Sequence, residues 1–593
     1  MTPVVSARPL RFGVMCSANG LTDFARKCIA NITRDGIAVP VLLIVDKSIA
    51  VPNSVRTKLR KSIRLDGNLW HVQSKLFPLS RLEAYRVQPL DACLPGVERI
   101  LCKPETKGKW SQYFQAADLA EIQSRNLDFI LKFGFGIIRG AVLESARYGV
   151  WSFHHDDEEK YRGGPPGFWE IYRGDPVTGA LLQRLNDRLD GGIVLYKCFV
   201  PTDGASHRAN LQRIQECSWH MVRWACLDVI HGRLEAFRAL PSKTTAPIYR
   251  APKDFQVLRF WLRLAANWIR YKLANQRVDE WNVGLVNHPQ AAFLDPQFKP
   301  VVQWSAYKEF GQMVADPFPI SSGDSARILV EEFNWSTEKG RISELRGSGA
   351  QTIITPVIDE GLHMSYPYCF RDAGVTYAIP ECGEAKSIFL YRLDELTGNW
   401  RREAVLLDGV DAVDATVFQH DGRWWLLHSG SVGCGAWSLY VWHAPSLLGP
   451  WQPHLANPVK TDVKSSRPAG NLFLHDGNLY RPSQDGRTSY GGALCINRVD
   501  ELSLECFRET PVRWIAPDPQ GPYPNGLHTL SGCGQYSLID GKRHTWPLGL
   551  LLRRQIGKRL RLQPRGFSYS KVRQADPAPV KAAVGAADSG LLR

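Results

Sequence analysis

The stretch WSFHHDDEEKYRGGPPGFWEIYRGD, residues 151–175, places two histidines and four carboxylates in front of a Gly-Gly-Pro-Pro turn. Transfer of a one-carbon acyl group to an amine needs a base for the ammonium proton, a donor to the developing oxyanion, and a carboxylate that holds the base in its useful protonation state. His154, Ser152 and Asp190 have the side chains for these three roles. We therefore treat this stretch as a candidate reaction centre.

Other interpretations of the same residues stay open. Two adjacent histidines, taken alone, are typical of a hydrogen-bonded loop pair. A zinc site is a third interpretation, but adjacent histidines on a strand point apart and no third ligand has suitable spacing, so we expect no metal. The acidic run 156–159 is most simply a solvated face, with contact to the ammonium group of a substrate as the alternative.

The sequence pattern around these residues predicts the elements that position them: an α/β domain with a mostly parallel, Rossmann-type sheet over residues 10–205. The segment from residue 10 to Asp46 has the pattern of a strand, a helix and a second, apolar strand. The apolar run 127–135 predicts a buried strand and then a helix, and residues 149–153 enter another strand. The candidate centre thus begins at the carboxyl end of a strand, where open α/β sheets bind ligands.

A helical linker is expected over residues 206–279. It comprises a helical pattern over 207–240 and an amphipathic helix over 255–276, whose apolar side chains face a stripe of arginines. A basic amphipathic helix that contains tryptophan can lie on a membrane surface. We favour a structural role, in which this helix packs between two domains, because nearly half of its circumference is apolar.

From residue 280 to 555 the pattern changes to short strands and turns. Four phrases recur at intervals of 50 to 60 residues, each interpreted as an Asp-Gly or Asp-x-Gly turn that leads into an aromatic strand: DAGVTYAIPE, HDGRWWLLHS, HDGNLYRPSQD and DGKRHTWPLG. This repetition predicts an all-β propeller of five blades. Residues 556–593 are expected to be a basic, disordered tail.

Composition limits the functional class. The net charge of +15 over 593 residues is scattered, so we expect no nucleic-acid partner. The 13 cysteines occur singly, no signal peptide is recognisable, and no apolar run is long enough to span a bilayer. We expect a cytoplasmic protein, peripheral to the inner face of the membrane if the helix binds lipid; the oligomeric state stays open.

The first domain resembles the formyltransferase family through WSFHH (151–155), YRGGPP (161–166) and RLDGGIVL (188–195), which occur in the family's order. By position, His154 resembles the catalytic histidine and Asp190 the catalytic aspartate, whereas Ser152 stands where the family has asparagine. The resemblance implies 10-formyltetrahydrofolate as donor. It also implies donor contacts from the FGFG segment and substrate contacts from the YRGG loop: Phe133, Gly134 and Gly136, and Arg162 and Gly163.

The second half resembles the propeller domain of plant glucosamine inositolphosphorylceramide transferases and, more distantly, five-bladed furanosidase propellers. Asp316 in ADPF and Asp414 in VDATVFQHDGRWWLL match two carboxylates of the hydrolases, but the third position falls in RPAGN, which has none. We therefore expect a funnel that binds sugars. Its further candidate lining residues are Glu331, Glu381, Arg467, Gln484, Asp485 and His528.

Together the two halves predict formyl transfer, or transfer of a related acyl group, to an amino sugar, a nucleotide sugar or a glycolipid in the biosynthesis of a surface polysaccharide. One alternative is a glycosyltransferase that acts through the propeller. Another is a carbohydrate-binding protein whose two sites have lost catalysis.

Overall fold

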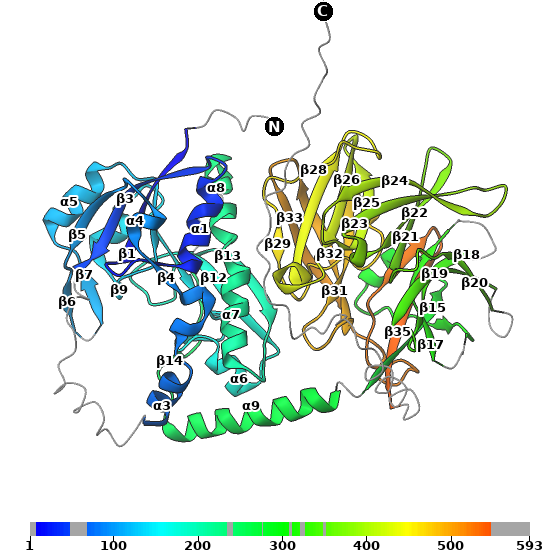
Figure 1. Ribbon diagram of the computed structural model, residues 1–593, viewed down its shortest axis with the longest axis horizontal. Helices are drawn as coiled ribbons and strands as arrows, with labels where there is room; N and C mark the ends of the chain where they lie inside the picture. The colour runs from blue at the N-terminus through cyan, green and yellow to red at the C-terminus, as the bar shows by residue number, and fades with distance from the viewer. Residues whose placement is uncertain are drawn as a thin grey trace, which may run out of the picture.

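The computed structural model describes the chain outside several short segments and the C-terminal tail (Figure 1). The residues not described are 1–7, 48–67, 109, 234–240, 275–276, 308–310, 321–326, 348–351 and 547–593. The predicted disordered tail therefore lies outside the described residues.

The first domain is built on a seven-stranded mixed sheet with the order β13-β12-β10-β8-β1-β3-β5. Five strands, β10, β8, β1, β3 and β5, pair in parallel, whereas β12 pairs antiparallel with both β10 and β13 at one edge. The predicted α/β class is confirmed. The strands are β1 (Leu10–Ser17), β3 (Ala38–Asp46), β5 (Glu98–Cys102), β8 (Phe129–Lys132), β10 (Val150–His154), β12 (Val177–Arg184) and β13 (Ile193–Pro201).

Helices cover both faces of this sheet because its strands are buried on both sides. On one face the core includes side chains of α1 (Asp23–Thr33), α7 (His207–Ser218) and α8 (Met221–Ile230). On the other face lie α5 (Ala116–Ser124) and the 3₁₀ turn η4 (Gly140–Glu144).

Two sequence expectations need correction here. The helix expected after the run 127–135 is only the 3₁₀ turn η4. The continuous helical pattern expected over 207–240 is two helices as far as residue 230, α7 and α8, which are separated at residues 219–220, and residues 234–240 lie outside the described residues.

The second half consists of five antiparallel sheets, which form the predicted five-bladed propeller (Figure 1). Four blades are built from consecutive strands, starting with β17 (Gln312–Pro319), β21 (Ser365–Asp372), β25 (Val413–His420) and β30 (Phe473–His475). The fifth blade closes the ring by pairing β15 (Val278–Val286) with β35 (Tyr536–Thr545), which are far apart in sequence.

The remaining propeller strands complete these blades. They are β16 (Val302–Trp304), β18 (Arg327–Asn334), β19 (Lys339–Arg346), β20 (Ile353–Ile358), β22 (Val375–Glu381), β23 (Ser387–Leu393), β24 (Trp400–Asp408), β26 (Arg423–Ser429), β27 (Ser438–Ala444), β28 (Gln452–Pro453), β29 (Lys460–Thr461), β31 (Asn478–Asp485), β32 (Ala493–Leu502), β33 (Phe507–Ile515) and β34 (Leu530–Cys533).

The recurring Asp-Gly signal has two structural meanings. Asp421 and Asp476 have positive φ angles and lie in the tight turns before β26 and β31, as turn chemistry requires. Asp540, in contrast, lies inside β35 and is fully buried. The interpretation of every Asp-Gly pair as a turn is therefore wrong for this one.

The two halves are joined by a disulfide and by polar contacts. Cys217 of α7 is bonded to Cys434 of the propeller, although the cysteines occur singly in the sequence. Arg508 of β33 forms an ion pair of 3.1 Å with Asp228 of α8. The indole of Trp224 donates hydrogen bonds to carbonyls in the loop before β29. These links hold the first domain against the propeller.

The predicted amphipathic helix is α9 (Asp254–Ala274), which packs against α3 (Asn68–Leu76) and α6 (Phe168–Arg173) of the first domain. Among its described side chains only Val257 and Phe260 are buried. The favoured interpretation, a helix packed between two domains, is corrected: most of its apolar residues are exposed. Within the described residues, no helix is long and apolar enough to cross a bilayer.

Candidate functional site

The structure brings His154 and Asp190 together at the carboxyl end of β10. The Nδ1 atom of His154 lies 3.6 Å from Oδ1 of Asp190, and its Nε2 atom lies 3.0 Å from the carbonyl oxygen of Tyr161. Both side chains are largely buried. Because both ring nitrogens face oxygen atoms, a proton on each nitrogen would have an acceptor. The site is thus suited to hold a proton on this ring between a carboxylate and a carbonyl.

The loop that presents Asp190 is held by residues that the sequence assigned to substrate binding. The backbone N–H of Gly163 donates a hydrogen bond of 2.8 Å to Oδ2 of Asp190, and the guanidinium of Arg162 donates to the carbonyl of Leu189. Asp190 itself has φ of +49°, a left-handed conformation that costs a non-glycine residue energy. Arg162 and Gly163 therefore position the carboxylate.

A side chain that the sequence analysis missed, Lys132, lies on the same face of the sheet. It ends β8 and is the register partner of Ser152 on the adjacent parallel strand. Register partners in parallel strands point to one side, so Lys132, Ser152 and His154 share a face. Burial lowers the pKa of Lys132 to about 8, and the charge of Asp190 opposes this shift. The sequence feature that could have identified this residue is a lysine inside the apolar run 127–135.

The residues predicted to contact the formyl donor have structural roles in the loop after β8. The ring of Phe133 packs against Phe24 and Phe153, in the apolar core of the opposite face from His154. A Cβ atom on Gly134 would lie 2.6 Å from the backbone of Cys16, so this glycine allows the loop to pass close to β1. Gly136 donates its N–H to the side chain of Gln112. These three residues shape the loop beside the site.

The acidic run is not a solvated face, and that expectation is wrong for two of its members. Asp156 and Glu158 are nearly fully buried. The ammonium of Lys197 on β13 lies 3.0 Å from Glu158 and 2.9 Å from Glu159, and its charge offsets part of the negative charge of the run. Burial, with the neighbouring carboxyl of Glu170, raises the pKa of Asp156. Lys197, rather than a substrate amine, already pairs with these carboxylates.

The propeller contains a second cluster, built on repeated distortions of its innermost strands. Asp316, Tyr366 and Asp414 occupy the same place in β17, β21 and β25, each with a positive φ and each at an irregularity of strand pairing. Strained backbone of this kind is retained where surrounding contacts fix it, commonly at functional sites. Tyr366 was not among the sequence candidates, although it stands in the third equivalent position.

Asp316 lies in a network with the closing blade. Its Oδ1 atom accepts a hydrogen bond of 2.6 Å from Thr529 and lies 3.7 Å from Nδ1 of His528. The same His528 nitrogen lies 2.5 Å from Oδ2 of Asp540. One ligand atom from each of Asp316, His528 and Asp540 lies within 4.8 Å of the others, a grouping that their mutual ion pairs explain. Asp540 was missed because its Asp-Gly pair was interpreted as a turn, and Thr529 because no local motif marks it.

Asp414 is neutralised by a different partner. Its Oδ2 atom is paired with the guanidinium of Arg467 and accepts a hydrogen bond of 3.0 Å from Gln484. Its backbone N–H donates to Glu381. Asp485 does not join this group, since its carboxylate is paired with Arg487.

Glu331 and Glu381 are the carboxyls of this cluster that favour the protonated state. Burial, followed by the charge of Asp414, raises the pKa of Glu381 to about 8. Burial, followed by the charge of Asp316, raises the pKa of Glu331 well above its usual value. Burial also raises the pKa of Asp316 itself to about 6. The cluster therefore combines carboxyls that favour the protonated state with Asp414, which is ion-paired with Arg467, an arrangement typical of acid–base sites.

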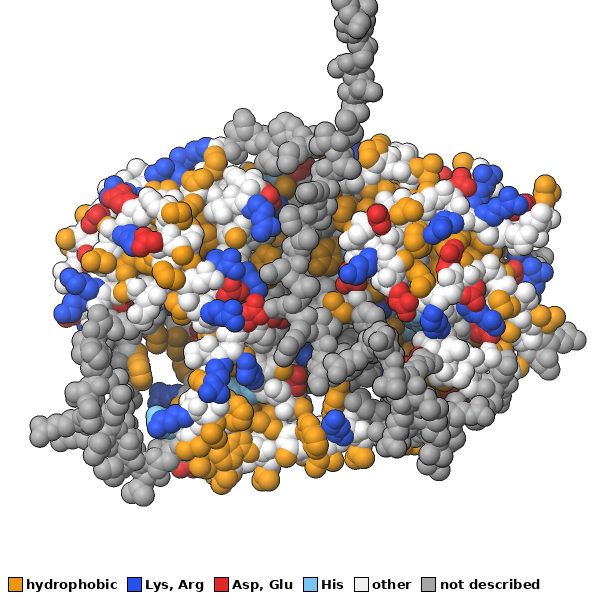
Figure 2. All heavy atoms as spheres, viewed as in Figure 1, with side chains coloured by type: hydrophobic (Ala, Val, Ile, Leu, Met, Phe, Trp, Pro, Cys, Tyr) orange, Lys and Arg blue, Asp and Glu red, His pale blue; other side chains and the backbone are white. Residues whose placement is uncertain are grey.

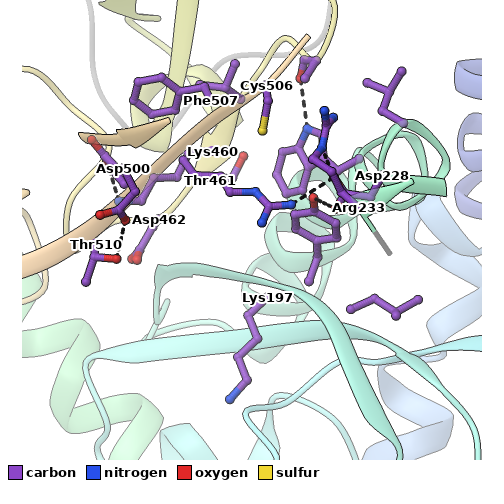
Figure 3. Close-up of a pocket in the computed structure, with 18 of the residues that line it drawn as sticks. Lys197, Asp228, Arg233, Lys460, Thr461, Asp462, Asp500, Cys506, Phe507 and Thr510 are labelled. Atoms are coloured by element: carbon purple, nitrogen blue, oxygen red, sulfur yellow. Dashed lines mark hydrogen bonds and ion pairs between the residues drawn. The ribbon is translucent and has the colours of Figure 1, made fainter. Parts of the chain in front are cut away.

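A cavity of about 610 Å³ lies between the two halves, apart from both clusters (Figure 3). Figure 3 shows Asp228 and Arg233 from the first half facing Lys460 and Asp462 from the propeller. The charged groups here are largely paired with protein, for example Arg233 with Asp228 and Lys460 with Glu509. The cavity belongs to the contact between the halves.

Fold and site together define a transferase-like chain of two parts, a formyltransferase-like α/β region and a propeller. Residues 281–522 match the family model described as "Glucosamine inositolphosphorylceramide transferase 1, N-terminal". The chain is 34% identical over 228 residues to glucosamine inositolphosphorylceramide transferase 1 of Oryza sativa subsp. japonica, and 32% identical to that of Arabidopsis thaliana. Each match covers 37% of this chain and 30% of the plant protein. The chain thus spans under a third of these relatives.

The first region is similar to methionyl-tRNA formyltransferase of Halalkalibacterium halodurans, with 26% identity over 264 residues, 41% of this chain and 77% of that protein. Among solved structures, a glycinamide ribonucleotide transformylase from Symbiobacterium toebii is 14% identical and covers 37% of this chain and 89% of its own (TM-score 0.25). An α-L-arabinofuranosidase from Podospora anserina is 11% identical and covers 40% of this chain and 91% of its own (TM-score 0.31).

Proposed function

We propose that the first domain transfers a formyl group, or a related acyl group, to the amine of an amino sugar, and that the propeller binds the sugar or glycolipid. The observation that carries this proposal is the pairing of His154 with Asp190 at the carboxyl end of β10. The similarity to methionyl-tRNA formyltransferase supports formyl as the group transferred. The propeller match supports a sugar or glycolipid acceptor.

The residues present fit 10-formyltetrahydrofolate as donor in one respect: Ser152 and Lys132 offer a hydroxyl and a buried amine on the face of the sheet where a formyl oxygen would need donors. When bound, this donor supplies an electrophilic formyl carbon. The acceptor amine forms the new C–N bond, and the bond from the formyl carbon to the donor nitrogen breaks. Protonated His154 and Ser152 stabilise the oxyanion, while Asp190 orients the imidazole and relays the ammonium proton to the leaving nitrogen.

The experiment is a mass-spectrometric assay of the full chain with nucleotide-linked amino sugars, with and without 10-formyltetrahydrofolate. We expect a gain of one formyl mass that disappears in His154→Ala and persists in Asp187→Asn, because Asp187 is exposed and lies outside both clusters. No gain with any amino sugar, together with no folate binding, would overturn the proposal.

A second candidate is glycosyl transfer in the propeller. It is favoured by one observation: Asp316, Asp414 and Glu331 meet in a buried cluster that mixes ionised and proton-bearing carboxyls. Under this function Asp414→Asn abolishes turnover of a sugar nucleotide, whereas His154→Ala leaves it unchanged. Turnover that survives Asp414→Asn would exclude this candidate.

A further inference from the structure

The inner face of helix α9 packs against the first domain. Val257 and Phe260 are buried there, and the ring of Phe260 stacks on Phe168 of α6 at 4.3 Å between centroids. The indole of Trp261 donates a hydrogen bond of 2.6 Å to Gln73 of α3. This face explains why the helix docks on the domain.

The opposite side of α9 carries a second apolar stripe that nothing in the described part of the chain covers. At 100° per residue, its members fall within a sector of about 60°, diametrically opposite the packed face. Their exposed fractions are large. The members are Phe255 (62%), Leu258 (50%), Leu262 (72%), Ile269 (52%) and Leu273 (55%).

The last two turns of the helix are exposed on every side. Residues 268–274 are all exposed, and they include Trp268 at 54% and Tyr271 at 44%. In Figure 1, α9 continues past α6 along the lower edge of the molecule. Figure 2 shows hydrophobic side chains gathered along this edge. A contiguous apolar patch of this kind marks an interaction site.

The charge around the stripe indicates what covers it. Arg259, Arg270 and Lys272 flank the stripe and are exposed, whereas the only acidic residue of the helix is Asp254 in its first turn. Two copies of α9 packed stripe to stripe would bring cations together without acidic partners, which is unfavourable. An anionic surface would satisfy the same cations while apolar side chains enter its hydrocarbon boundary.

We propose that α9 docks the protein on an anionic lipid bilayer. The helix lies in the plane of the interface, with Leu262 and Ile269 inserted and the flanking cations at the level of the headgroups. Its packed inner face fixes the orientation of the first domain above the surface. This role is independent of the reaction that either cluster performs.

The test is co-flotation of the full chain with vesicles of phosphatidylcholine alone or with about 30% phosphatidylglycerol, a content at which basic helices bind measurably. We expect binding to the anionic vesicles and at least about tenfold weaker binding for the double variant Leu262→Asp, Ile269→Asp. Leu474→Asp is the control, because Leu474 lies on the propeller and is 71% exposed, close to the 72% of Leu262. The double variant changes exposed residues, so its unfolding midpoint should match that of the parent chain.

The contributions of charge and of apolar insertion to vesicle binding can be measured separately. Arg259→Gln with Arg270→Gln should weaken binding to anionic vesicles and should remove most of its salt dependence. Equal flotation of the parent and the Leu262→Asp, Ile269→Asp variant would overturn the proposal. So would a dimer in light scattering that this variant alone dissolves, since the stripe would then be an interface between copies of the chain.

Discussion

Replacement of Asp190 by asparagine tests how the proposed acyl-transfer site works. The change keeps the size of the side chain and an oxygen that can accept the N–H of Gly163, but it removes the charge 3.6 Å from His154. Two unit charges at this distance interact with about 5 kcal/mol at an effective dielectric constant of about 20. Since partial solvent access reduces this value, we expect formyl transfer to fall about 10²- to 10³-fold while the fold is unchanged.

The assay is single-turnover formyl transfer followed by mass spectrometry, with Asp187→Asn as the control, because Asp187 is exposed in the same loop. The variant should also shift the pH dependence. Asp190 opposes the burial that lowers the pKa of Lys132 to about 8, so its loss moves this pKa further down. An Asp190→Asn enzyme within threefold of the parent rate would refute the reasoning about the charge pair.

Three further predictions concern stability. Burial raises the pKa of Glu381 to about 8. Between pH about 4.5 and 8 the native state therefore holds a proton that the unfolded state has lost, so the free energy of unfolding falls as the pH rises. The urea midpoint of Glu381→Gln should fall less steeply over this range than that of the parent chain. Glu509→Gln leaves the fully buried Arg481 without its counter-ion, and urea unfolding should show a loss of about 3–5 kcal/mol. Cys217→Ser opens the 217-residue loop closed by Cys434 and should cost up to about 5 kcal/mol, measured as a lower melting temperature that reductant no longer changes.

Local patterns were sufficient to predict β1, α1, β3, β8 and β10 of the first domain, and the position of His154 at the end of β10. The apolar run before residue 135 predicted β8, and the next strand ends at His154, at the edge where ligands bind. The assignment of Asp190 depended on family resemblance, because its approach to His154 is set by a loop 35 residues later. Lys132 escaped notice because its apolar neighbours dominate the pattern.

The rest depended on tertiary contacts that no local window contains. Asp156 is buried because the chain folds α6 over it, and Lys197 arrives from a strand 40 residues away. Asp540 was assigned to a turn since Asp-Gly is the strongest short hairpin signal, yet its strand pairs with residues 278–286. The exposure of the outer stripe of α9 could not be predicted from the sequence either, because an apolar pattern does not show which side of a helix is covered by other residues.

Closure of the propeller by β15 and β35 has a consequence for biosynthesis. These strands are separated by about 250 residues, so the ring stays open on the ribosome until the last strand has emerged. Asp540, which organises His528 beside Asp316, lies on that last strand. A partly synthesised chain therefore has open strand edges and no assembled carboxylate cluster, and completion of the ring and completion of the cluster are a single event.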